Sequence, residues 1–252
     1  FFHIVNKSWI FGRAAFPIKF EVCIDNEDGI NACIAGKAGR IELCSALDVG
    51  GLTPSIELMK LAVNCPIPTR VMIRPKSGDF YFSSLDMRKM IADISSARSL
   101  GLEGVVLGVT TKNAELDKEA LKILSECAVG MGRTLHRAVD STLNPIDSVE
   151  IAIELGFDCI LSSGGSNTAT QGIRILKEMH NRAAGRIDIM PGSGINSDNV
   201  DQVSKSFKPN WFHSSCSSQS QNIVKLNQLE LEEGVKGFTD LKKIINLRNA
   251  IN

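Results

Sequence analysis

Eight short apolar runs alternate with eight longer segments of helical periodicity from Lys19 onward, and this alternation restricts the chain to very few folds. The predicted strands are Lys19–Ile24, Arg40–Cys44, Thr69–Ile73, Val105–Leu107, Thr134–His136, Cys159–Leu161, Ile187–Met190 and Trp211–His213. The predicted helices are about Asn26–Ala35, Pro54–Asn64, Ser84–Leu100, Asp117–Cys127, Pro145–Leu155, Thr170–Arg182, Asp198–Ser206 and Asp240–Asn249. Eight strand–helix units in about 230 residues predict an α/β protein with one domain, a (β/α)8 TIM barrel.

A doubly wound open sheet is the competing architecture. Its first strand is commonly followed by a glycine-rich phosphate loop, whereas here the first strand is followed by Asp25-Asn26-Glu27-Asp28. The sequence therefore favours the barrel over residues 18–252, and we expect no nucleotide cofactor.

The segments outside the strand–helix alternation carry three further expectations. Residues 1–17 show no clean apolar run or small-residue cleavage site, so we expect an N-terminal extension outside the core. The polar, acidic stretch 219–237 is expected to be a loop inserted before the last helix. Thr53, Asn144 and Ser197 precede predicted helices and are the expected helix caps.

Composition excludes several classes of partner. The 28 Lys and Arg residues balance 28 Asp and Glu residues, so net charge gives no reason to expect nucleic acid or an anionic membrane as a partner. No apolar run approaches the roughly 20 residues of a membrane-spanning helix. Seven cysteines without a CxxC pair argue against a disulfide framework or a zinc knuckle. We therefore expect the protein in a reducing compartment, the cytoplasm, with the nucleus as an additional alternative.

The strand alternation places charged side chains inside the predicted barrel. Residues that alternate with the outward apolar positions are expected to face the interior. They are Glu21, Cys23, Asp25, Glu42, Cys44, Arg70, Met72, Arg74, Thr134 and His136. Buried carboxylates need partners, and Arg70 or Arg74 are the expected partners of Glu21 and Glu42. A purely structural salt-bridge network is an equally good interpretation for Glu21.

Seven motifs, each at a predicted strand-to-loop junction, resemble the CutC copper homeostasis protein family. They are FEVCID (20–25), RIELCSALDVGGLTPS (40–55), VMIRPKSGDFYFS (71–83), TLHRAVD (134–140), LSSGG (161–165), MPGSGI (190–195) and FHSS (212–215). The resemblance implies a TIM barrel, a role in copper homeostasis, no securely assigned reaction, and a homo-oligomer. It also implies that Cys23 and Cys44 bind Cu(I). The sequence departs from the family pattern at Leu135, Val139 and Ser193.

Two arguments from the residues bear on these cysteines. Thiolates are soft ligands that select Cu(I), and Cys23 and Cys44 are expected at equivalent inward places on neighbouring strands, about 4.8 Å apart. Arg74 is expected to favour their thiolate forms, and Met72 offers a thioether. Against this, a free cysteine often serves as a small buried hydrophobic residue. The nearby carboxylates of Glu21 and Glu42 also oppose ionisation of the two thiols unless they are paired.

The loops after the seventh and eighth strands predict a second site. In barrels these loops commonly hold phosphate, and here Gly192, Ser193, Gly194 and Ser214 are the anion-binding candidates. Glycines at these places also simply make tight turns.

The alternative function is a barrel enzyme for a small phosphorylated or carboxylated substrate. Its acid–base pair would be Glu42 and His136, with Asp140 or Glu42 orienting the histidine and Arg74 clamping the anion. A scaffold acting only through oligomeric contacts is a third possibility.

Overall fold

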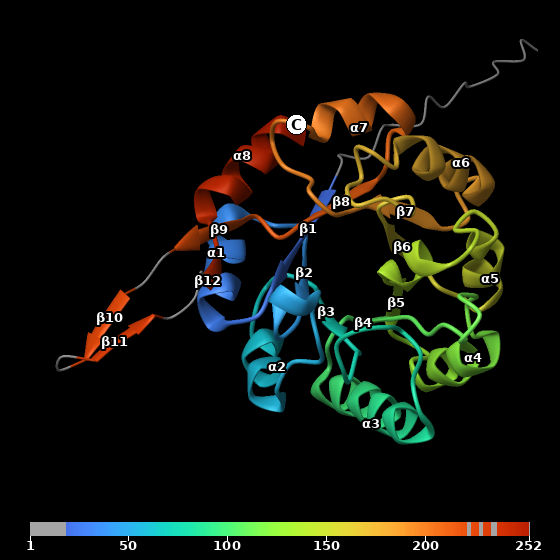
Figure 1. Ribbon diagram of the computed structural model, residues 1–252, viewed down its shortest axis with the longest axis horizontal. Coiled ribbons are helices and arrows are strands. Elements are labelled where there is room, and N and C mark those ends of the chain that lie inside the picture. The colour runs from blue at the N-terminus through green and yellow to red at the C-terminus, as the bar shows by residue number, and fades with distance from the viewer. Residues whose placement is uncertain (1–18, 221–222, 227–228, 233–235, 252) are drawn as a thin grey trace, which may run out of the picture.

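Eight parallel strands build a barrel in the computed structural model, which describes residues 19–220, 223–226, 229–232 and 236–251. The strands are β1 (Lys19–Ile24), β2 (Arg40–Leu43), β3 (Thr69–Met72), β4 (Gly104–Leu107), β5 (Gly132–Leu135), β6 (Cys159–Ser162), β7 (Asp188–Pro191) and β8 (Trp211–Ser214). Hydrogen bonding runs in the order β7-β6-β5-β4-β3-β2-β1-β8, and β8 contacts β7 to close the ring (Figure 1). The predicted TIM barrel is confirmed. The predicted extension 1–17 lies outside the described residues.

The helices form an outer ring around the strands (Figure 1). They are α1 (Glu27–Gly36), α2 (Ile56–Val63), α3 (Ser84–Leu100), α4 (Lys118–Cys127), α5 (Ser148–Glu154), α6 (Ile173–Ala183), α7 (Val200–Phe207) and α8 (Leu241–Ile251). None of the helices described here is long and apolar enough to cross a membrane.

The three predicted helix caps are wrong by two or three residues. Ser55 caps α2, while Thr53 accepts a hydrogen bond from the backbone N–H of Arg74. Asp147 and Asn199 occupy the N-cap positions of α5 and α7. Before α5 and α7 the chain forms a turn at 145–147 and 197–199, and before α2 it stays extended at Ser55, so each helix starts later than the sequence indicates.

The stretch 219–237, predicted as a loop, contains strands. β9 (Ser217–Ser220) pairs with β12 (Lys236–Thr239), and β10 (Ile223–Leu226) pairs with β11 (Leu229–Glu232), both antiparallel. Figure 1 shows these two pairs extending outward from the barrel next to α1. The prediction of a loop rested on the polar and acidic composition of the stretch, which does not exclude antiparallel pairing between its segments.

The inward and outward assignment of the strands is confirmed. Phe20, Val22 and Ile24 belong to the large apolar layer between the strands and the helices. Inside the barrel only two small apolar clusters occur in the described residues, one around Cys44 and Met72 and one around Cys159. Charged side chains fill much of the remaining interior.

Glu21 is fully buried, and its ion-pair partners are Arg40 and His213. These two residues lie directly opposite Glu21 in the register of β2 and β8, so all three side chains enter the barrel side by side. Arg40 donates to one carboxylate oxygen, and His213 Nδ1 lies 2.8 Å from the other.

The sequence-based expectation that Arg70 or Arg74 would pair with Glu21 is wrong. Arg70 instead binds Glu103, Thr134 and Asp158. The register, which the sequence does not reveal, decides which charges meet.

Replacing Glu21 by Gln tests this arrangement. The change leaves Arg40 buried without its counter-ion, and breaking a buried pair in this way costs about 3–5 kcal/mol. We expect the free energy of unfolding in urea to fall by that amount. Asp201→Asn breaks the exposed Asp201–Lys205 pair and should cost less than about 0.5 kcal/mol. Equal effects of the two substitutions would contradict the structural role of Glu21.

Candidate functional site

The C-terminal ends of the strands surround a cavity of about 930 Å³. This is the face on which TIM barrels build their sites. One part of its wall is acidic or thiol-bearing, another is basic, and β9 and β12 complete the rim. The polar side chains and glycines that line the cavity include Cys23, Asp25, Glu42, Asp48, Arg74, His136, Arg137, Ser193, Gly194, His213 and Ser214.

Cys23, Glu42 and His213 form a buried cluster of possible metal ligands. One ligand atom from each, the thiol sulfur, a carboxylate oxygen and an imidazole nitrogen, lie within 4.8 Å of one another. The strand register explains the grouping, because Cys23 on β1 lies directly opposite Glu42 on β2, and His213 follows on β8 at the other side of β1.

The charges in this cluster are coupled. Burial opposes a charged imidazole, but Glu42 and hydrogen bonding to Cys23 and Glu21 raise the pKa of His213 well above its usual value. Burial raises the pKa of Glu42 to about 7, with His213 opposing the shift and Glu21 adding to it. His213 is therefore protonated at neutral pH and lies between the ionised Glu21 and a Glu42 that is only partly ionised.

Cys44 lies one layer above this cluster. Its backbone N–H donates to the carbonyl of Ile24, and Cys44 is two residues beyond Glu42, which places it about 6.6 Å further along the barrel than Cys23. Its thiol donates to Glu42 Oε2 at 3.6 Å. The expectation that the two cysteines occupy equivalent places is wrong, because neighbouring strands are staggered.

Gly51 closes the space above the Cys44 thiol. The backbone φ angles of Gly50 and Gly51 are +87° and +85°, in the left-handed region that favours glycine. A side-chain carbon at Gly51 would lie 3.0 Å from Cys44 Sγ. Cys44 is fully buried, whereas Cys23 lines the cavity.

Neither cysteine is a ready-made thiolate. Burial raises the pKa of Cys23, with His213 opposing the shift, and burial together with Glu42 raises the pKa of Cys44 well above its usual value. The expectation that Arg74 makes them thiolates does not hold, since desolvation outweighs it.

Arg74 follows β3 and is 5% exposed. Its guanidinium donates to the backbone carbonyls of Val49, Gly51 and Gly78, and it lies over the Phe80 ring at 4.9 Å. These partners are neutral, and Arg74 makes no ion pair within the described part of the chain.

His136 lies at the end of β5 and is 2% exposed. Its Nδ1 accepts a hydrogen bond from the Ala138 N–H, and its ring contacts Phe80 at 4.8 Å between centroids. Burial, and then the charge of Arg74, lower the pKa of His136 to about 3. It is therefore neutral at pH 7 and a weak base, which argues against the predicted role as a general base.

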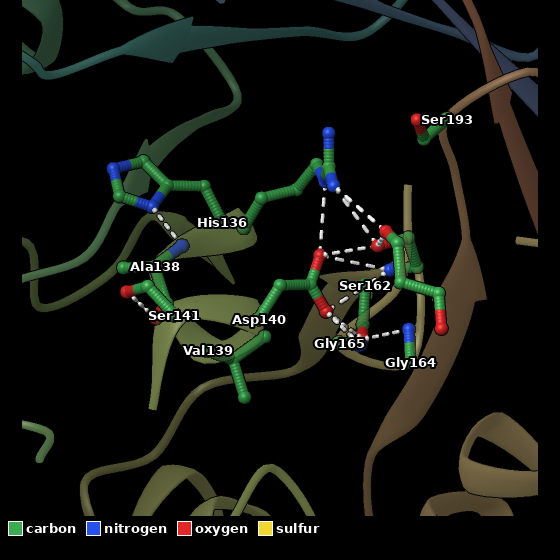
Figure 2. Close-up of polar contacts among 12 residues, drawn as sticks. His136, Ala138, Val139, Asp140, Ser141, Ser162, Gly164, Gly165 and Ser193 are labelled. Carbon is green, nitrogen blue, oxygen red and sulfur yellow. Dashed lines mark hydrogen bonds and ion pairs between the residues drawn. The ribbon is translucent and has the colours of Figure 1, made fainter. Parts of the chain in front are cut away.

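Asp140 does not orient His136. Figure 2 shows the His136 ring pointing away from the Asp140 carboxylate, which faces Ser162 and Gly165. Asp140 accepts hydrogen bonds from the Ser162 and Ser163 hydroxyls, from the Ser163 and Gly165 N–H groups, and from Arg137. Its role is to fasten the loop after β5 to the loop after β6.

The predicted anion-binding residues lie where the sequence placed them, after β7 and at the end of β8. Ser193 and Gly194 line the cavity, as does Ser214, whereas Gly192 packs against Leu161 and His213. The Ser193 hydroxyl donates to the Asn167 carbonyl and the Ser214 hydroxyl to the Ile195 carbonyl. The Gly192 N–H donates to the Ser162 carbonyl, so neither these hydroxyls nor this N–H is available to an anion.

The sequence reasoning missed His213 as a possible ligand. The signal was present, because Phe212 is outward on β8 and its neighbour must then face the interior, at the level of Glu21.

The fold and this site define a TIM barrel with a thiol, an imidazole and a carboxyl group gathered at its mouth. Residues 18–218 match the model of the CutC family. Family protein CutC of Rhizobium meliloti is 45% identical over 236 residues, which cover 93% of this chain and 96% of that protein. The corresponding protein of Vibrio atlanticus is 39% identical over 242 residues, 92% and 98% of the two chains. The chain belongs to the CutC family.

Solved structures give the same result at the level of the fold. A crystal structure from Streptococcus agalactiae, described as a copper homeostasis protein CutC, is 32% identical with a TM-score of 0.75, covering 79% of this chain and 98% of that one. Thiamine phosphate pyrophosphorylase from Pyrococcus furiosus is 15% identical with a TM-score of 0.56, covering 93% of this chain and 96% of that chain, and shares the fold alone.

The low pKa of His136 predicts an acid-sensitive stability. In the unfolded chain the imidazole gains its proton near pH 6.5, whereas the folded protein resists it down to about pH 3, so stability falls as the pH drops through that window. From pH 7 to pH 5 we expect His136 to remove about 2 kcal/mol from the free energy of unfolding.

His136→Asn keeps an acceptor for the Ala138 N–H and cannot be protonated. The difference in unfolding free energy between wild type and variant, measured in urea at pH 7 and pH 5, should shrink or reverse by that amount. A difference that is independent of pH would show that the histidine titrates normally.

Proposed function

We propose that this protein binds Cu(I) at the mouth of its barrel, through the thiolates of Cys23 and Cys44 with His213 as a third donor once its imidazolium has lost a proton to solvent, and serves copper homeostasis. The observation that carries the proposal is the buried cluster of Cys23, Glu42 and His213 within 4.8 Å. Membership of the CutC family supports it, since a structure 32% identical to this chain is described as a copper homeostasis protein.

The donor set fits Cu(I) by its chemistry. Thiolate and imidazole are soft and intermediate ligands, and Cu(I) accepts low coordination numbers, whereas Ca²⁺ or Mg²⁺ would require several oxygen ligands. All seven cysteines are free thiols, which agrees with a reducing environment in which Cu(I) persists.

Glu42 explains how a protonated thiol yields a thiolate when copper arrives. Its carboxyl group accepts the Cys44 S–H hydrogen bond, and its pKa of about 7 allows it to take up a proton that copper displaces. Glu42 Oε1 has no hydrogen-bond partner among the described residues, so this oxygen can accept the proton.

Competition of the reduced protein with a Cu(I) chelator tests the proposal. We expect Cys23→Ser to weaken Cu(I) binding by more than the roughly 10–100-fold caused by loss of an outer partner of a metal ligand. Cys44→Ser should weaken it as well. Cys127→Ser, at a half-buried thiol at the end of α4, is the matched control and should bind as wild type. Unchanged affinity in both site variants would refute copper binding here.

The alternative is a barrel enzyme acting on a small phosphorylated or carboxylated molecule, and one observation favours it. Glu42 combines a pKa of about 7 with an unpartnered carboxylate oxygen on the wall of the 930 Å³ cavity. A group of this kind suits proton transfer at neutral pH. His136, with a pKa of about 3, would serve as a hydrogen-bond donor and not as the base.

Carbon-13 NMR of carboxyl-labelled glutamate tests the premise of this alternative. One resonance should titrate near pH 7 and be missing in Glu42→Gln. If every glutamate titrates below pH 5, Glu42 has no special acid–base property.

A further inference from the structure

Arg74 and His136 line the cavity, and each has a buried side-chain nitrogen, Nε and Nε2, without a hydrogen-bond partner in the described part of the chain. Both residues are at least nine-tenths buried, with exposed fractions of 5% and 2%. A buried donor without a partner lowers the free energy of unfolding by about 1–3 kcal/mol. Two such donors therefore lie on the wall of one cavity at a cost in stability. Neither residue is among the proposed Cu(I) ligands Cys23, Cys44 and His213.

The hydrogen bonding of His136 shows which nitrogen carries the proton. Because Nδ1 accepts from the Ala138 N–H, a neutral ring must carry its proton on Nε2. His136 therefore offers a fixed donor, and its neutrality at pH 7 follows from burial.

Arg74 adds a positive charge to these donors. Its hydrogen-bond partners are the carbonyls of Val49 and Gly51 at Nη1 and of Gly78 at Nη2, which are neutral and leave the charge without a counter-ion. A buried charge is normally paired. A negatively charged ligand supplies the missing counter-ion.

Phe80 brings the two groups together. The Arg74 guanidinium lies 4.9 Å from the ring centroid of Phe80, and the His136 ring lies 4.8 Å from it. All three side chains line the same cavity, whose volume of about 930 Å³ suits an organic molecule and far exceeds the needs of a metal ion.

We infer that the mouth of the barrel binds a small organic monocarboxylate, whose carboxylate accepts hydrogen bonds from Arg74 and His136. Asp25, Asp48 and Glu42 line the same cavity together with Arg137 and His213, so the wall carries no large excess of positive charge that would favour a phosphate dianion over a monocarboxylate. The loops after β7 and β8 are the weaker anion site, since the Ser193 and Ser214 hydroxyls already donate to backbone carbonyls.

This inference is independent of copper binding. The carboxylate site uses donors from β3 and β5, whereas the proposed ligands of Cu(I) come from β1, β2 and β8. It is therefore tested on copper-free protein in the presence of a chelator.

The experiment is a titration of the full chain with acetate, butyrate and inorganic phosphate, followed by NMR of ¹⁵N-labelled histidine. We expect saturable binding of the two carboxylates and a downfield shift of the His136 Nε2 proton in wild type, with the His180 resonance unmoved. This readout requires no variant. Phosphate should bind more weakly.

Matched variants give the second arm. His136→Asn keeps the acceptor for Ala138 but lacks the Nε2–H donor, and it should weaken carboxylate binding by roughly tenfold to a hundredfold. His180→Asn, on α6 against Phe207, should bind as wild type. The inference is overturned if no carboxylate saturates, if the His136 resonance does not move, if His136→Asn binds equally well, or if phosphate binds more tightly than the carboxylates.

Discussion

The ion pairs of the fully buried Glu21 carboxylate are the interaction on which the interior of this barrel depends. Burial would raise the pKa of Glu21, but Arg40 and His213 lower it to about 2, so the group stays ionised at the centre of the fold. Glu21 also accepts a hydrogen bond from His213, whose second nitrogen lies 3.8 Å from Glu42. Glu42 is the main cause of the raised pKa of His213, and Glu21 adds to it, so His213 links the buried ion pair to the cluster at the mouth of the barrel.

Much of this architecture follows from the sequence. Eight alternating units predict the barrel, and period-two patterning correctly separates Phe20, Val22 and Ile24 from Glu21 and Cys23. These features are encoded locally, in the preference of each segment and the need to cover one face of each strand. The strand pairs at 217–239 were predicted as a loop from the polar and acidic composition of the stretch, although Leu229–Glu232 does alternate between apolar and acidic residues.

The details of the site were less predictable, for a geometric reason. Which side chains meet inside a barrel depends on the stagger between neighbouring strands, and no local pattern encodes that stagger. It places Cys23 opposite Glu42 and lifts Cys44 by one layer. It also gives Glu21 the partner Arg40. Asp140 illustrates a second limit, since four of its five donors come from a loop more than twenty residues away.

The rim of the cavity has a consequence for diversity among related proteins. Gln219, Gly237 and Phe238, from the β9–β12 pair, form one side of the entrance, and all three lie after residue 218, where the match to the family model ends. Phe238 is 46% exposed and carries none of the interior packing. Substitutions in this appendage would reshape what can enter while the strand register beneath stays intact, so selectivity at the gate can evolve separately from the chemistry inside.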